Sequence, residues 1–171
     1  YGILCKSEMA AAISLLCCIA AGKTAVPLPV RYGQEHYLKI LECAEPPVIL
    51  SDYDGALTEI RYTTDSFVND LYEDTAVVLF TSGSTGTPKG VMLSEDNIIA
   101  NVRGISAYLP IDQRDTILIS RPLYHSSVMT GEFLVALCNG AKIVFSSEPF
   151  RPLPILKLLK ESKKKEKNVL K

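Results

Sequence analysis

The stretch that decides the fold lies mid-chain, where the apolar run Thr75-Ala-Val-Val-Leu-Phe80 leads directly into Thr81-Ser-Gly-Ser-Thr-Gly-Thr-Pro-Lys-Gly90. The apolar run has the length and composition of a buried β-strand. In the residues that follow, glycines let the backbone N–H groups converge on an anion, hydroxyl side chains add donors, and Lys89 adds a positive charge. Placed directly after a strand, this combination predicts a phosphate-binding loop.

The spacing of the loop disfavours the two commonest phosphate motifs. The P-loop of nucleoside triphosphatases needs a glycine, four residues, and then Gly-Lys followed by Ser or Thr. Here Pro88 precedes Lys89, and Gly90 stands where that hydroxyl residue belongs. The dinucleotide fingerprint needs a Gly-x-Gly pair, which Gly83-Ser-Thr-Gly86 lacks. An unrelated P-loop nucleoside triphosphatase is therefore the weaker alternative.

The segments on either side of the loop alternate between helical and extended patterns. Before it, we expect a helix capped by Ser7 and running to about Ala21, a strand at 24–28, a helix at 34–43, a strand at 48–50 and a short strand at 59–63. After it, we expect a strand at 91–93, a helix at 95–108 capped by Ser94, a strand at 116–120, a helix near 131–138, a strand at 141–145 and a last helix from 153. This alternation predicts an α/β fold with largely parallel sheets flanked by helices.

The composition is that of a folded globular chain. The 171 residues are 47% hydrophobic and 22% charged, which excludes a disordered or fibrous protein and fits one domain or a piece of a larger one. Seven lysines and two glutamates fall in residues 157–171, whereas the rest carries eleven basic and seventeen acidic residues. Because the main body is acidic, the basic end is expected to be a solvated helix end or loop, and no nucleic-acid partner is expected.

The cysteines predict neither a disulfide framework nor a metal site. There are five, none spaced as Cys-x-x-Cys, and only two histidines could complete a metal site. We expect them to be small buried hydrophobic residues in a reducing compartment, which favours a cytoplasmic location. The five are Cys5, Cys17, Cys18, Cys43 and Cys138.

One apolar run could be mistaken for a membrane or targeting segment. Met9 to Ala21 is thirteen residues long, whereas about 20 are needed to cross a bilayer. Glu8 precedes the run, the chain opens with Tyr1 rather than Met, and only Lys6 gives the start a basic character. We therefore expect a buried helix and no membrane span.

The loop also carries a resemblance to a known family. Thr-Ser-Gly-Ser-Thr-Gly-Thr-Pro-Lys-Gly-Val (81–91) resembles the phosphate-loop motif of adenylate-forming enzymes, which include acyl-CoA synthetases and the adenylation domains of nonribosomal peptide synthetases. Ala20 to Leu28 is similar to the family's upstream Ala-Gly-x-x-x-x-Pro-Leu element. Arg121-Pro-Leu-Tyr-His125 resembles its Pro-Leu-Phe-His segment, and Gly140 to Val144 fits a following strand. The resemblance covers about residues 5–155.

The resemblance implies a two-step ligase reaction. A carboxylic acid would react with MgATP to form an acyl-adenylate, and the thiol of CoA or of a phosphopantetheine carrier would then displace AMP. Lys89 is the implied catalytic residue, and Tyr124 and His125 would shape the acid pocket, with no proton transfer assigned to His125. The metal ligands stay unassigned. The implied ATP-binding residues are Thr81, Ser82, Gly83, Ser84, Thr85, Gly86, Thr87 and Lys89.

Parts of the family pattern are not found in the sequence. No Tyr-Gly-x-Thr-Glu segment, no Thr-Gly-Asp segment and no C-terminal domain with a catalytic lysine follows Phe150. We therefore expect residues 1–171 to be a partial N-terminal AMP-binding domain that does not catalyse adenylation alone. Two alternatives stay open: a non-catalytic nucleotide-binding fragment, and the adenylation domain of a nonribosomal peptide synthetase. By the same resemblance, Pro122-Leu-Tyr-His125 favours fatty or aryl acids over amino acids as the substrate, and CoA as the acceptor.

Overall fold

The computed structural model describes residues 1–53, 55–61, 72–81 and 88–146, together with 152, 153, 155–157 and 160. In chain order the elements are β1 (Gly2–Leu4), α1 (Glu8–Ala20), β2 (Val26–Pro27), the 3-10 turn η1 (Val30–Tyr32), α2 (Gln34–Ala44), β3 (Val48–Ser51), β4 (Thr58–Arg61), β5 (Thr75–Thr81), β6 (Lys89–Ser94), α3 (Glu95–Tyr108), β7 (Thr116–Ile119), α4 (Ser126–Val128), the π-helical turn η2 (Met129–Leu134), α5 (Val135–Cys138) and β8 (Lys142–Phe145). The described residues among 152–160 are helical, as expected.

The strands of the described residues form a mixed but largely parallel arrangement. The first sheet has the order β2-β1-β3-β4, with β1 parallel to both β2 and β3 and β4 antiparallel to β3. β5 and β6 pair as an antiparallel hairpin, and β7 pairs with β8 in parallel. The α/β class with parallel strands flanked by helices is confirmed, and β4 and the hairpin are its antiparallel parts.

The hairpin is joined to the first sheet beside β2. The Ala25 N–H donates to the Ala76 carbonyl at 2.8 Å, and the Val78 N–H donates to the Ala25 carbonyl at 2.9 Å. The Thr24 hydroxyl adds a bond to the Thr75 carbonyl at 2.7 Å. β5 therefore continues the sheet, and the predicted phosphate loop is attached to the main body of the fold.

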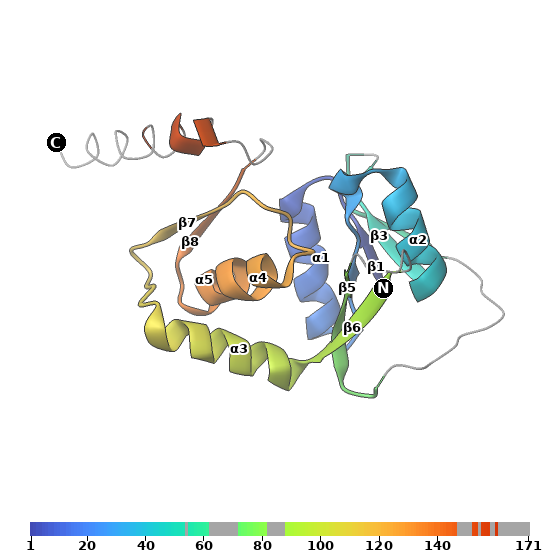
Figure 1. The fold of residues 1–171 in the computed structure, drawn as a ribbon, viewed down its shortest axis with the longest axis horizontal. Helices are drawn as coiled ribbons and strands as arrows, with labels where there is room; N and C mark the ends of the chain where they lie inside the picture. Colours follow the sequence, from blue (N-terminus) through green and yellow to red (C-terminus); the bar gives the residue numbers. More distant parts are fainter. Residues whose placement is uncertain are drawn as a thin grey trace.

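Two apolar cores cover the two faces of this sheet. Because successive side chains of a strand point to opposite faces, Val77 packs with α1 while Val78 packs with α2. The larger core also takes in α3, β7 and the α4–α5 segment, so α1 lies between the main sheet and the second half of the described chain (Figure 1). One continuous core thus holds the hairpin, α3 and the segment after β7 in fixed relation.

Local signals fixed most helix boundaries. Ser7 caps α1 by accepting the Ala10 N–H, and Ser94 forms a capping box with Asn97 at the start of α3. The helix expected near 131–138 starts earlier, at Ser126, because the carbonyl of His125 accepts the N–H groups of Val128 and Met129 and begins the first turn. The serines, Thr130 and Gly131 are weak helix formers, which hides this start from a propensity pattern.

Two further expectations need correction. β1 was not expected, since three residues are too few to give a period-two pattern. Cys5 and Cys18 are buried, but Cys17, Cys43 and Cys138 are exposed, so the expectation that the cysteines are buried holds for only two of the five. Across the part of the chain that the structure describes, no helix has the length and apolar character needed to cross a membrane.

Candidate functional site

The predicted phosphate loop connects β5 to β6, and its described members Thr81 and Lys89 stand at the end of the hairpin that we call the hairpin tip. Thr81, the last residue of β5, pairs with Lys89, the first residue of β6, and the Thr81 hydroxyl donates to the Lys89 carbonyl at 3.4 Å. Both residues are exposed, in contrast to the buried start of β5. Thr81 and Lys89 therefore flank the loop from two adjacent strands. The other predicted members, Ser82, Gly83, Ser84, Thr85, Gly86 and Thr87, lie outside the described residues.

Gly90 fits the packing of the hairpin as well as the loop motif. A Cβ atom at this position would lie 3.0 Å from Val78 Cγ1 and 3.3 Å from Phe80 Cζ. Gly90 is the partner of Phe80 across the hairpin. The glycine thus leaves room for the Phe80 ring and allows β5 and β6 to pair closely beside the loop.

The second predicted group, Tyr124 and His125, lies on the connection between β7 and α4. Leu123 is buried and anchors this connection, while the Tyr124 and His125 rings are in contact with their centroids 4.5 Å apart. The His125 N–H donates to the Pro122 carbonyl at 3.2 Å, which closes a tight turn just before the helix. We call residues 122–125 the corner.

The electrostatics of the corner favour a neutral imidazole. Burial is the largest effect that lowers the pKa of His125 below its usual 6.5, and the positive charge of Arg121 lowers it further. Arg121 is held by an ion pair with Glu132 at 2.5 Å. At neutral pH the neutral form of the His125 imidazole is therefore favoured over the cation.

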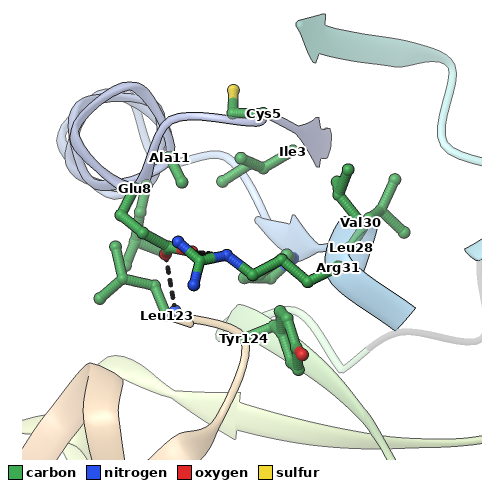
Figure 2. Close-up of a pocket in the computed structure, with 11 residues that line it drawn as sticks. Ile3, Cys5, Glu8, Ala11, Leu28, Val30, Arg31, Leu123 and Tyr124 are labelled. Atoms are coloured by element: carbon green, nitrogen blue, oxygen red, sulfur yellow. Dashed lines mark hydrogen bonds and ion pairs between the residues drawn. The ribbon is translucent and has the colours of Figure 1, made fainter. Parts of the chain in front are cut away.

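A small cavity lies behind the corner, between α1, η1 and Tyr124 (Figure 2). Its volume is about 20 Å³, which is room for roughly one water molecule. Glu8 and Arg31 form an ion pair on its wall at 3.3 Å. The cavity is too small for an organic acid, so Tyr124 faces a packed wall on this side.

A much larger groove opens between α3 and the first turns after His125, and neither Tyr124 nor His125 is among its lining residues. Its volume is about 500 Å³, within the range of small-molecule sites. The groove combines apolar walls with hydroxyl and amide side chains. Its lining residues are Leu93, Asn97, Ile98, Asn101, Ile105, Tyr108, Leu109, Ser126, Ser127, Thr130 and Gly131.

The groove and the phosphate loop are linked by one strand. Lys89 begins β6 and Leu93, near the end of the same strand, lines the groove. At a strand rise of about 3.3 Å per residue, the two positions are roughly 13 Å apart along the strand. A ligand with a phosphate-bearing end and an organic end could therefore contact both.

The groove residues were not among the sequence predictions. Asn97 and Asn101 are one helical turn apart on α3, a spacing that places them on one face, but polar residues at such positions are normal on any solvated helix. Their partners across the groove, Ser126 and Ser127, are distant in sequence. A polar pair at helical spacing was the available signal, and it does not identify a binding groove by itself.

The described residues do not support metal binding or a reactive cysteine at this site. No group of three or more His, Cys, Asp or Glu side chains among the described residues could hold a metal ion. Burial raises the pKa of the Cys5 thiol to about 11, so this cysteine stays protonated and unreactive at neutral pH. The described part of the site is therefore built from hydroxyl, amide, imidazole and ammonium groups.

Comparison with known proteins places these features in context. The sequence profile of a family described as AMP-binding enzyme matches residues 65–165. A hybrid PKS-NRPS synthetase, phm1 of Pyrenochaetopsis sp, is 29% identical over 168 residues, which is 86% of this chain and 4% of that protein. The acyl-CoA ligase sidI of Aspergillus fumigatus is 34% identical over 90 residues, which is 53% of this chain and 15% of that protein.

Solved structures share the fold. O-succinylbenzoate coenzyme A synthetase from Bacillus subtilis, in complex with AMP, superposes with a TM-score of 0.71 at 22% identity, covering 94% of this chain and 46% of that one. A malonyl-CoA ligase with methylmalonyl-CoA and AMP bound gives a TM-score of 0.69 at 21% identity, covering 88% and 35%. The chain thus spans less than half of these structures and a much smaller part of the curated relatives.

Proposed function

The chain belongs to the AMP-binding enzyme family, and from this premise we propose that it forms the ATP-phosphate and acid-binding part of a carboxylate-activating ligase. The observation that carries the proposal is the arrangement of two sites along β6: the hairpin tip with Thr81 and Lys89 at one end, and the groove beside the corner at the other. An acyl-adenylate has phosphate and organic parts that match such a pair of sites. The proposal treats residues 1–171 as part of the N-terminal domain of the ligase.

The proposed reaction has two steps. A carboxylate oxygen of the acid attacks the α-phosphorus of ATP. The bond between this phosphorus and the oxygen that bridges to the β-phosphorus breaks, so pyrophosphate leaves and the acyl-adenylate is formed. The sulfur of CoA or of a phosphopantetheine arm then attacks the acyl carbon, AMP leaves with its bonding electrons, and the thiol proton is released. Such transfers depend mainly on positioning and on neutralising spread charge.

At the phosphate end, Lys89 is the proposed catalytic residue. Its ammonium group would bind phosphate oxygens and neutralise the charge that accumulates on them. Thr81 and the loop Ser82–Thr87 would add hydroxyl and N–H donors. Mg²⁺, which the family's substrate MgATP implies, would supply further charge neutralisation, but no step is assigned through it because the described residues hold no cluster suited to a metal.

At the acid end, Tyr124 and His125 would form the wall where the corner meets the groove. The lowered pKa of His125 keeps its imidazole neutral, which suits a residue that shapes a pocket for an organic acid. The apolar groove residues, among them Ile98 and Ile105, would contact the body of the acid. Asn101 and Ser127 would contact its polar groups.

The acceptor of the acyl group is proposed as CoA or a carrier-bound phosphopantetheine. Similarity to an acyl-CoA ligase supports the first, and the longer alignment with a hybrid PKS-NRPS synthetase supports an adenylation domain that loads a carrier protein. A non-catalytic nucleotide-binding chain is the third candidate function.

We propose a cytoplasmic location for the protein, which its five free cysteines support.

Titration with ATP tests the phosphate site. Lys89→Ala is expected to weaken ATP binding by about ten- to a hundredfold, because it removes a charge-assisted contact to phosphate. Lys39→Ala is the matched control: Lys39 is an exposed lysine on α2 that pairs with Glu35, and its removal should leave ATP affinity unchanged.

Calorimetry or equilibrium dialysis provides the measurement. Equal affinity of the wild type and the Lys89→Ala variant would contradict the assignment of the hairpin tip. ATP–pyrophosphate exchange separates the remaining candidates: we expect the 171-residue chain to bind ATP without exchange. Turnover by this chain alone would show that it holds a complete adenylation site.

A further inference from the structure

Glu8 connects three distant segments of the chain through one carboxylate. It is the first residue of α1, and its side chain is only 11% exposed. Oε1 pairs with Nε of Arg31 in η1 at 3.3 Å, and Oε2 accepts the backbone N–H of Leu123 at 3.0 Å. Figure 2 shows the carboxylate between the Arg31 guanidinium and the Leu123 backbone.

This contact is not explained by stability alone. Burial is the main effect on Glu8 and raises its pKa above the usual 4.5, opposed by the Leu123 N–H and then by Arg31. An ion pair with one largely buried partner, Glu8, and one half-buried partner, Arg31, gains little net stability, because desolvation offsets much of the attraction. An apolar side chain could fill the same space, but it could not hold a specific backbone N–H in place.

The hydrogen bond acts on the residue directly before the two rings of the corner. Leu123 is 2% exposed and immediately precedes Tyr124 and His125. The turn between Pro122 and His125 is closed by a backbone hydrogen bond, and the Tyr124 and His125 rings are in contact. A shift of the Leu123 peptide would therefore move both rings relative to the groove that begins at Ser126.

We propose that Glu8 is a positioning residue for the acid-binding end of the site: its carboxylate, held by Arg31, fixes the Leu123 peptide and thereby the orientation of Tyr124 and His125. The proposal rests on the proposed function for its consequence, since the corner is taken to form the wall of the acid pocket. Glu8 lies 115 positions before Leu123, the residue whose peptide it holds.

The first test reads the corner directly by NMR on the purified protein. Glu8→Gln keeps the size of the side chain but removes its charge, so the Leu123 amide and the His125 imidazole signals should both shift and His125 should titrate at a different pH. The control is Glu35→Gln, which alters another first-turn glutamate, on α2, and should leave both signals in place. Unchanged signals in Glu8→Gln would overturn the proposal.

The second test separates positioning from simple neutralisation of Arg31. In the double variant Glu8→Gln with Arg31→Met, no unpaired guanidinium is left, so restored wild-type signals would mean that Glu8 only neutralises Arg31, and the proposal would fail. We expect the altered corner to persist. Glu8→Asp, which keeps the charge but is shorter by one methylene, gives the same test with a smaller expected shift if Glu8→Gln does not fold.

Ligand binding links the corner to the function. The probes are ATP and three sulfamoyl-adenosine analogues of acyl-adenylates, carrying acetyl, octanoyl or benzoyl groups. We expect Glu8→Gln to raise Kd for the analogue that binds wild type most tightly by roughly tenfold, as for loss of a charged hydrogen bond, while Kd for ATP stays within about twofold. Equal Kd values for that analogue in the variant and the wild type would overturn the proposal. Absence of ATP and analogue binding in the wild type would instead contradict the proposed function, and the NMR result would stand separately.

Discussion

At the scale of single residues, His125 shows how a side chain acquires its chemical state from its neighbours. Its sequence context, Pro122-Leu-Tyr-His125, indicates a pocket residue, but the state of the imidazole depends on Arg121 and on burial. Arg121 in turn is held by Glu132, eleven residues further along the chain. The neutral imidazole is therefore a product of the local fold.

Removing the Arg121 charge tests this account. Arg121→Gln is expected to raise the pKa of His125 toward 6.5, because one of its two lowering effects disappears. NMR titration of the imidazole measures the shift. Arg103→Gln, an exposed change on α3, serves as the control and should leave the titration unaltered. An unchanged pKa in Arg121→Gln would leave burial as the sole cause.

The same lowered pKa gives the sign of a stability effect. The unfolded chain binds a proton at His125 more readily than the folded chain, so unfolding free energy rises with pH through the interval between the lowered folded value and 6.5. As the pH falls through that interval, protonation of His125 lowers the free energy of unfolding. The Arg121→Gln variant should show a weaker pH dependence there.

At the scale of elements, the β5–β6 hairpin has a tightly packed base beside the loop that we propose to bind phosphate. Gly90 sits opposite Phe80, and a Cβ atom there would require the Val78 and Phe80 side chains to shift. The loop motif and the packing of its base thus depend on the same residue. The motif glycine does not need to contact phosphate to be required.

Gly90→Ala tests the packing role. We expect it to lower the unfolding free energy by about 1–3 kcal/mol, because the added Cβ would lie only 3.0 Å from Val78 Cγ1. Gly104→Ala is the matched control, since a Cβ there meets nothing within 4 Å inside α3. That change should stabilise the protein by up to about 1 kcal/mol through helix propensity. Denaturant unfolding distinguishes the two, and equal effects would refute the packing explanation.

At the scale of the whole molecule, α1 joins the two halves of the described chain. Leu15, Val77, Ile119 and Val128 belong to one core although they come from four separate elements. α1 also starts with Glu8, whose carboxylate reaches the corner. The β5–β6 hairpin, the groove and the corner are therefore placed relative to one another by a single helix and its core.

Leu15→Ala tests this cooperative core. Leu15 is 1% exposed, so its truncation is expected to cost about 2–5 kcal/mol and to lower the stability of the whole molecule in one transition. Ile13→Ala, on the exposed side of the same helix, should change stability by only about 0.5 kcal/mol. Two separate unfolding transitions in Leu15→Ala would show that the halves do not share one core.

The features that could be predicted from the amino-acid sequence are those with local signals. The loop 81–90 carries its donors and its lysine in ten consecutive residues, and the caps at Ser7 and Ser94 define the starts of α1 and α3. The parallel α/β class followed from the alternation of helical and extended segments. The caps and the α/β class are confirmed because each depends on residues close in sequence, whereas phosphate binding by the loop stays a prediction.

How these parts meet depends on packing between segments that are far apart in the chain. The contact between Glu8 and Leu123 spans 115 positions, and the groove joins Asn101 of α3 to Ser127 beyond β7. Which face of α1 is buried was equally undetermined, since Ile13 and Leu15 are both apolar but one is exposed and the other is in the core. Such features depend on which surfaces pack together across the sheet, and periodicity, capping and composition carry no information about a partner so far away in the chain.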